Sequence, residues 1–137
     1  MTTANLLAKN NWRFYTFSLF WAAIILCLSF WNGNDLPNAP HYVIEPDKMV
    51  HFILYFVFTF SVFIAFKKVS YRSGLKATNR KAFGVAFVLS MLTEAIQIIA
   101  KERTFDFEDL MANFFGIVIA GLVLRFILGK QIFYKLS

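Results

Sequence analysis

Charged residues are scarce in this chain of 137 residues. Only 16% of the residues are Asp, Glu, Lys or Arg, whereas 58% are hydrophobic, including 18 phenylalanines. Ordinary soluble domains have about 25% charged and about 45–50% apolar residues. A single domain of this length has too little interior to bury such an excess. The composition excludes a soluble globular domain and indicates an integral membrane protein.

Cysteine and proline are also rare, and their positions are informative. The one cysteine, Cys27, lies in an apolar run, so the sequence offers neither an internal disulfide nor a cysteine metal site. All three prolines lie within residues 37–46, which predicts an irregular loop there. Pro46 is suited to open a helix, because the N–H that it lacks has no partner in a first turn. Asp47 beside it suits the helix dipole.

Four apolar runs are long enough to cross a bilayer as helices, which takes about 17–25 residues each. They cover residues 14–31, 49–66, 82–100 and 110–129. Basic residues precede the first run, but no small-x-small cleavage site follows it, which favours a retained span over a signal peptide. The predicted fold is all-α. We expect one domain over residues 1–137, with four transmembrane helices in an antiparallel bundle.

The loops between these runs differ sharply in charge. Residues 67–81 hold six Lys or Arg and no acid, and the two terminal regions bring the basic total to eleven. The other two loops hold only Lys48, Lys101 and Arg103, together with seven of the eight acids. The positive-inside rule therefore predicts an inner-membrane protein with both termini and residues 67–81 in the cytoplasm. A basic loop beside anionic lipid accounts for the net charge of +6, so nucleic acid is not an expected partner.

Polar residues recur at helical spacing near the outer ends of three runs. The second run carries Asp47, Lys48, His51 and Tyr55 on one face. The third carries Ser90, Thr93, Glu94, Gln97 and Lys101. The fourth carries Asp106, Asp109, Asn113 and Gly116, at steps of three, four and three. If the spans alternate in direction, these faces meet in one zone at the outer leaflet.

Most of these residues also have a purely structural interpretation. Asp47 and Asp109 could be acids of a first helical turn, and the lysines and Arg103 could be interfacial anchors. Asn113 could join two helices by a hydrogen bond. Gly116 could permit a close helix approach.

Glu94 is harder to explain in this way. An ionised carboxylate inside a span costs several kcal/mol unless it is paired, hydrated or protonated. A buried ion pair is the structural alternative. Such pairs are weak sources of stability, so a functional site is the favoured interpretation.

The ordered series PDKMVHF, EAIQ and RTFDFEDLMANFFG resembles the motif series of the VanZ-like membrane proteins. The matching positions are Asp47, Lys48, His51, Glu94, Gln97, Arg103, Asp109, Asn113 and Gly116, within about residues 46–121. The family pattern leads us to expect a second glycine four residues after Gly116, but this chain has Ala120 followed by Gly121. The resemblance implies a small bacterial membrane protein of the cell envelope. The name-giving member is associated with reduced susceptibility to glycopeptide antibiotics such as teicoplanin, but family resemblance does not fix function.

The favoured function is the binding or handling of a polar-headed envelope lipid or a lipid-linked intermediate. Lys48 and Arg103 would hold its phosphate, carboxylates and amides would orient a sugar or amine, and a groove between spans would take the tail.

The main alternative is an intramembrane hydrolase or transferase acting on such a lipid. His51 and Glu94 would serve as base and acid, with Arg103 stabilising developing charge, although no G-x-S-x-G nucleophile motif is present. His51 with Asp47, Glu94 and Asp109 could bind a metal, but no dense ligand spacing supports this, so we expect no metal or other cofactor.

Two further classes remain open. Glu94 and His51 could relay protons in a transporter subunit, for which four short spans would have to assemble into a homo-oligomer. A structural membrane adaptor is the other.

Overall fold

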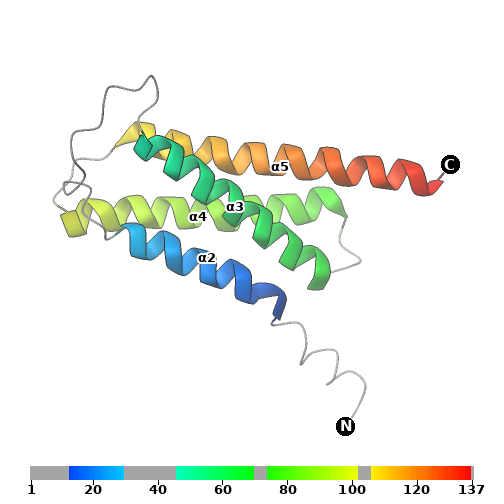
Figure 1. Cartoon of the computed structure of the whole chain (residues 1–137), viewed down its shortest axis with the longest axis horizontal. Coiled ribbons are helices and arrows are strands. Elements are labelled where there is room, and N and C mark those ends of the chain that lie inside the picture. The colour runs from blue at the N-terminus through cyan, green and yellow to red at the C-terminus, as the bar shows by residue number, and fades with distance from the viewer. Residues whose placement is uncertain (1–12, 30–45, 70–73, 102–105, 137) are drawn as a thin grey trace, which may run out of the picture.

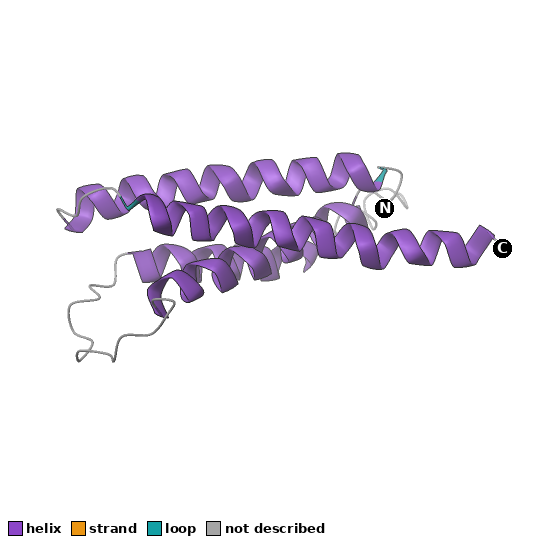
Figure 2. Ribbon diagram, turned by 90° about the horizontal axis from the view of Figure 1, so that it is seen from above, coloured by secondary structure: helices purple, strands orange, loops and turns teal. Residues whose placement is uncertain are grey.

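The computed structural model describes residues 13–29, 46–69, 74–101 and 106–136, and these form four helices (Figure 1). They are α2 (Arg13–Ser29), α3 (Pro46–Val69), α4 (Leu75–Lys101) and α5 (Phe107–Leu136). The described ribbon is helical with short loop pieces and contains no strand (Figure 2). The predicted all-α fold with four helices is therefore confirmed.

Three of the helices are long and apolar enough to cross a membrane. These segments are Asp47–Val69, Leu75–Ile99 and Phe107–Leu128. Helix α2 is apolar but has only 17 residues, at the lower limit of about 17–25 for a span. Large apolar side chains point outward, with Ile99 82% and Leu19 67% exposed. Lipid, rather than water, suits such a surface, and the protein is an integral membrane protein with three to four helical spans.

Helix α3 is the centre of the bundle. It packs against α2, α4 and α5, most extensively against α5. Successive helices run in opposite directions, so the starts of α3 and α5 lie at the same end as the close of α4 (Figure 1). The apolar core between them consists of Ile25, Tyr55, Phe58, Val62, Phe63, Ala82, Ala86, Ile117 and Leu124. Trp21 ties α2 to this core, since its indole N–H donates to the Leu54 carbonyl at 2.8 Å.

Gly116 marks the closest approach of α5 to α3. A Cβ built at this position would collide with the carbonyl oxygen of Phe52 and lie 3.1 Å from the backbone nitrogen of Phe56. Small residues allow backbones to come this close in membrane helix pairs. The contact fixes the register of the two helices, and it places His51, which precedes Phe52, beside the turn of α5 that contains Asn113.

The helices are longer than the apolar runs that predict them. Residues 67–81 were expected to form a basic loop, but α3 continues to Val69 and α4 already begins at Leu75. Lysines can extend α3 because cations in a last turn interact favourably with the helix dipole, as Lys67 and Lys68 do here. At the start of α4, the Thr78 N–H and hydroxyl both donate to the Gly74 carbonyl, at 3.0 and 3.2 Å.

Charge divides the bundle into two ends. The end that contains the starts of α3 and α5, called the polar end here, carries the acids Asp47, Asp106, Glu108 and Asp109. The opposite end, called the basic end, carries Lys67, Lys68, Lys76, Arg80, Lys81 and Arg125. The positive-inside rule predicts that the basic end faces the cytoplasm.

This orientation can be tested by labelling single cysteines in a Cys27→Ser background. We expect an impermeant thiol reagent added to intact cells to label Asn38→Cys, which precedes α3 in the chain, and to leave Ser70→Cys unlabelled. Both positions lie outside the described residues. Permeabilised cells provide the control in which both variants react. Labelling of the position 70 variant alone in intact cells would reverse the topology and move the polar end to the cytoplasm.

Candidate functional site

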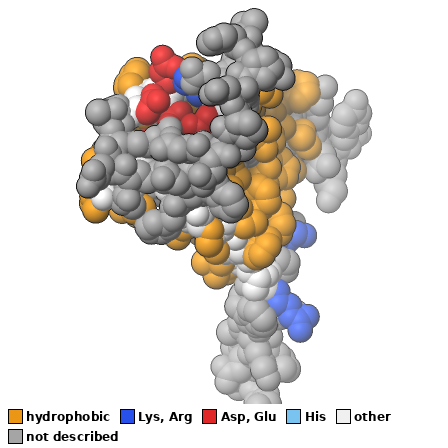
Figure 3. Space-filling model, turned by 60° about the vertical axis from the view of Figure 1, so that its left-hand side comes forward, with side chains coloured by type: hydrophobic (Ala, Val, Ile, Leu, Met, Phe, Trp, Pro, Cys, Tyr) orange, Lys and Arg blue, Asp and Glu red, His pale blue; other side chains and the backbone are white. Residues whose placement is uncertain are grey.

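Polar side chains from three helices meet inside the polar end. Glu94 and Gln97 of α4 and Asp109 and Asn113 of α5 are all buried. His51 of α3 is largely buried beside them, with its side chain 13% exposed. Figure 3 views this end, where acidic side chains gather on the surface next to a basic one. Burying groups of this kind costs free energy unless each finds a partner, so their contacts define the site.

A chain of hydrogen bonds links the three helices. The Asn113 amide donates from Nδ2 to Glu94 Oε1 at 3.3 Å, and its Oδ1 lies 3.0 Å from His51 Nδ1. An ionised Glu94 offers only acceptors, and in that form it selects the amide orientation in which Oδ1 faces His51. His51 must then carry a proton on Nδ1 to donate to that oxygen. This chain, Glu94–Asn113–His51, is called the relay below.

The other ring nitrogen of His51 faces two carboxylates. His51 Nε2 lies 3.9 Å from Asp47 Oδ1 and 3.8 Å from Asp109 Oδ2. Both distances exceed those of hydrogen bonds, which end at about 3.2 Å for N–H···O. The Asp47 side chain is 55% exposed, whereas that of Asp109 is 4% exposed. The cluster of His51, Asp47 and Asp109 is therefore shielded from solvent on the side of α5 and accessible to solvent at the start of α3.

Two further contacts frame the opening of the site. Lys48 forms an ion pair with Glu108 at 2.5 Å, which joins α3 to α5. Asp106 is exposed and caps α5, since its Oδ1 accepts from the Glu108 N–H at 2.8 Å. Glu108 did not emerge from the sequence reasoning as a site residue, although it lies between Asp106 and Asp109. Its ion pair with Lys48 depends on how α3 packs against α5, and the sequence alone does not show this packing.

Tyr55 and Thr93 lie directly beneath the relay. The Tyr55 hydroxyl lies 2.6 Å from Thr93 Oγ1, which itself donates to the Ser90 carbonyl at 3.0 Å. These three residues are buried in the interior of the bundle. Of the remaining candidates, Arg103 lies outside the described residues, and Lys101 ends α4 without a described side chain.

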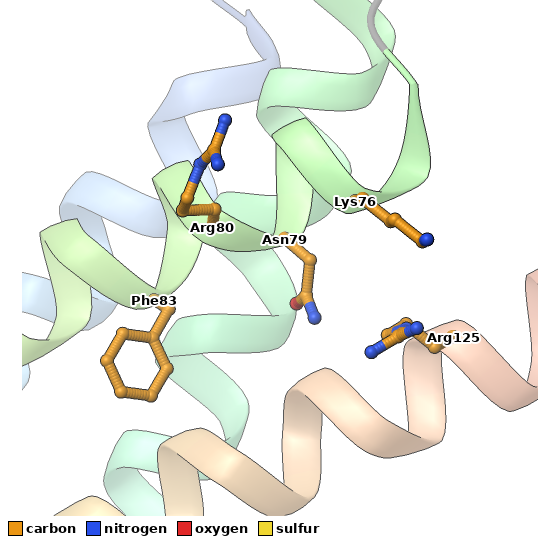
Figure 4. A pocket seen from close by; sticks show the side chains of 5 residues that line it. All are labelled: Lys76, Asn79, Arg80, Phe83 and Arg125. Atoms are coloured by element: carbon orange, nitrogen blue, oxygen red, sulfur yellow. The ribbon is translucent and has the colours of Figure 1, made fainter.

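A separate pocket of about 440 Å³ opens at the basic end, between α4 and α5 (Figure 4). It is lined by Lys76, Asn79, Arg80, Phe83 and Arg125. Asn79 and Arg125 point toward one another across it, and Arg80 points away. Sequence reasoning assigned Lys76 and Arg80 to a basic loop and Arg125 to the C-terminal end of the last span, but it did not anticipate a pocket. Basic side chains at the membrane interface suit anionic headgroups.

The fold and the site define a class of small helical membrane protein with a buried polar cluster at one end. A comparison with protein families identifies it further, because the model of the VanZ/LLP1 family matches residues 5–128. The chain belongs to this family, as the resemblance of its motifs indicated, and the match extends beyond the motifs to include α2. No curated protein and no solved structure shows significant similarity to the chain.

Proposed function

We propose that this protein binds or handles a polar-headed envelope lipid, or a lipid-linked intermediate, at the polar end. The observation that carries the proposal is the burial of Glu94, Gln97, Asp109 and Asn113 between apolar helices. Burying polar groups in a bilayer is costly, and such groups in membrane proteins usually mark a substrate or ion site. A bundle that served only as a scaffold would be more stable with apolar residues at these positions.

The arrangement suits a lipid with a charged head. Lys48 lies at the opening of the site and, with Arg103 from the segment between α4 and α5, would hold a phosphate. The amides of Gln97 and Asn113 would orient a sugar or an amine. Apolar side chains that α5 exposes, such as Phe107 in its first turn and Phe115 further along, would contact the acyl chains. The predicted topology places this site in the outer leaflet.

Native mass spectrometry of the detergent-extracted protein tests the proposal. We expect a lipid of defined mass to copurify with the wild-type protein and to be lost from Lys48→Met, because this variant removes a charge that holds the head. Lys68→Met removes the same charge from the exposed basic end of the same helix and should retain the lipid. Equal lipid retention by both variants would contradict the proposal. Teicoplanin susceptibility of cells with and without the protein then tests the link to resistance.

The geometry of His51 favours one alternative, an intramembrane hydrolase or transferase acting on the same lipid. Its ring is held at Nδ1 by Asn113, which leaves Nε2 available as a general base toward the opening. Incubation of the purified protein with the copurified lipid separates the two functions. A binding protein returns the lipid unchanged, and an enzyme converts it into a product of different mass.

A further inference from the structure

We propose that Asp47, His51 and Asp109 bind one divalent metal ion of the zinc type. The three residues each offer one ligand atom, and these atoms lie within 4.8 Å of one another. Asp47 and His51 are one turn apart on α3, and Asp109 faces them from the first turn of α5. The inference goes beyond lipid handling, because an ion can bind here whether or not a lipid does.

The relay determines which nitrogen is available to the ion. Since Nδ1 donates to Asn113, the neutral His51 ring has its lone pair on Nε2, which faces Asp47 and Asp109. With a neutral His51, this lone pair and one oxygen of each carboxylate are three potential ligand atoms that lie within 4.8 Å of one another. A cation between them would be attracted to all three. Histidines that bind metals are usually held in this way, with the second nitrogen donating to an oxygen that fixes the tautomer.

The distances fit a shared ion after a small adjustment. Two ligands at about 2.0–2.2 Å from a tetrahedral zinc ion lie about 3.4 Å apart. The two separations from Nε2 are 3.8 and 3.9 Å, so these two would have to close by a few tenths of an ångström, and the two carboxylate oxygens lie within 4.8 Å of one another. Asp47 is exposed and its side chain can turn toward the ion, whereas Asp109 is held in the interior.

Charge and ligand chemistry indicate the type of ion. Two carboxylates and a neutral imidazole carry a charge of −2, which a divalent cation balances. An imidazole ligand favours zinc and its neighbours in the transition series over magnesium or calcium, which prefer oxygen. Three protein ligands leave a fourth position open, as in zinc sites that bind water or a substrate oxygen.

The test uses the full chain, purified in detergent with a tag that contains no histidine, stripped with a chelator and then equilibrated with zinc chloride. We expect one zinc ion per chain by elemental mass spectrometry and a higher melting temperature with zinc, because a ligand that binds the folded state stabilises it. Magnesium and calcium at the same concentration should produce neither effect. Asp47→Asn and Asp109→Asn should each weaken zinc binding by more than about tenfold.

Asp106→Asn is the matched control. It removes a carboxylate at the same end, only three residues from Asp109, and asparagine retains the ability to cap α5. Its zinc affinity should equal that of the wild type. Asp47 is exposed, so its variant tests the site even if the buried Asp109→Asn fails to fold. A wild-type protein that binds no zinc, or an Asp47→Asn protein that binds it as tightly as Asp106→Asn, would overturn the proposal. Because no lipid enters this measurement, either result leaves the lipid site standing.

Discussion

Replacing Glu94 with glutamine is expected to leave the protein folded in the membrane and to abolish its ligand binding. Glutamine has nearly the same shape and can still accept the hydrogen bond from Asn113. It also carries donors, so it no longer dictates which way the Asn113 amide faces. When that amide turns over, His51 Nδ1 meets an NH₂ group instead of an oxygen. The substitution thus removes a charge and releases the tautomer of His51 while preserving the packing.

Lipid retention and thermal stability should be measured side by side on Glu94→Gln. Glu108→Gln makes the same substitution at a side chain that is 69% exposed, and it should retain its thermal stability. If Glu94 served only to brace the bundle by pairing with Arg103 or Lys101, the variant would lose about 3–5 kcal/mol and disappear from the membrane. A Glu94→Gln protein that is stable and still binds its ligand would rule out both interpretations.

Replacing Gly116 with alanine is expected to deplete the protein from the membrane. The added methyl group would collide with the backbone of α3 at Phe52 and Phe56. A backbone cannot move aside as a flexible side chain can, so α5 would have to move away from α3. The contact between these two helices is the most extensive one in the described bundle. Overpacking of this kind costs about 1–3 kcal/mol or more. Membrane abundance and the melting temperature in detergent report the loss.

Gly84→Ala provides the matched control for this prediction. Gly84 also lies inside a membrane helix, α4, but it is exposed and a Cβ there would meet nothing within 4 Å. Alanine is favoured over glycine in a helix by up to about 1 kcal/mol, so this variant should be as stable as the wild type or slightly more stable. Equal stability of the two alanine variants would show that α3 and α5 do not need the close approach at Gly116.

The helices could be predicted from the sequence because each is a long apolar run, but their ends could not. Apolar patterning stops at the membrane boundary, whereas a helix continues while its backbone finds hydrogen bonds. Thr78 illustrates this, since it belongs to the expected loop but forms part of the first turn of α4. Local chemistry predicted the opening of α3 more successfully, because Pro46 begins the helix and Asp47 lies in its first turn.

The candidate residues could also be selected from the sequence, but not their partners. Asp47 and His51 share a face by spacing alone, whereas Asp109 lies 58 residues beyond His51. Its distance from the imidazole depends on the register between α3 and α5, which the close contact at Gly116 fixes. The orientation of the Asn113 amide depends in turn on Glu94, from a third helix. These relations exist only in the packed bundle, which is why spacing in the sequence gave no support for the metal site that these residues could form.

The pair of Tyr55 and Thr93 separates the polar site from an apolar region of the bundle. Between this pair and the basic end, the described core is built from residues such as Phe58, Phe63 and Ala86. The buried hydroxyl of Thr59 in that region donates to a carbonyl of its own helix, at Tyr55. Within the described interior of one chain, a hydrated ion therefore meets an apolar barrier below the site. We therefore expect a ligand bound at the polar end to enter and leave at that end.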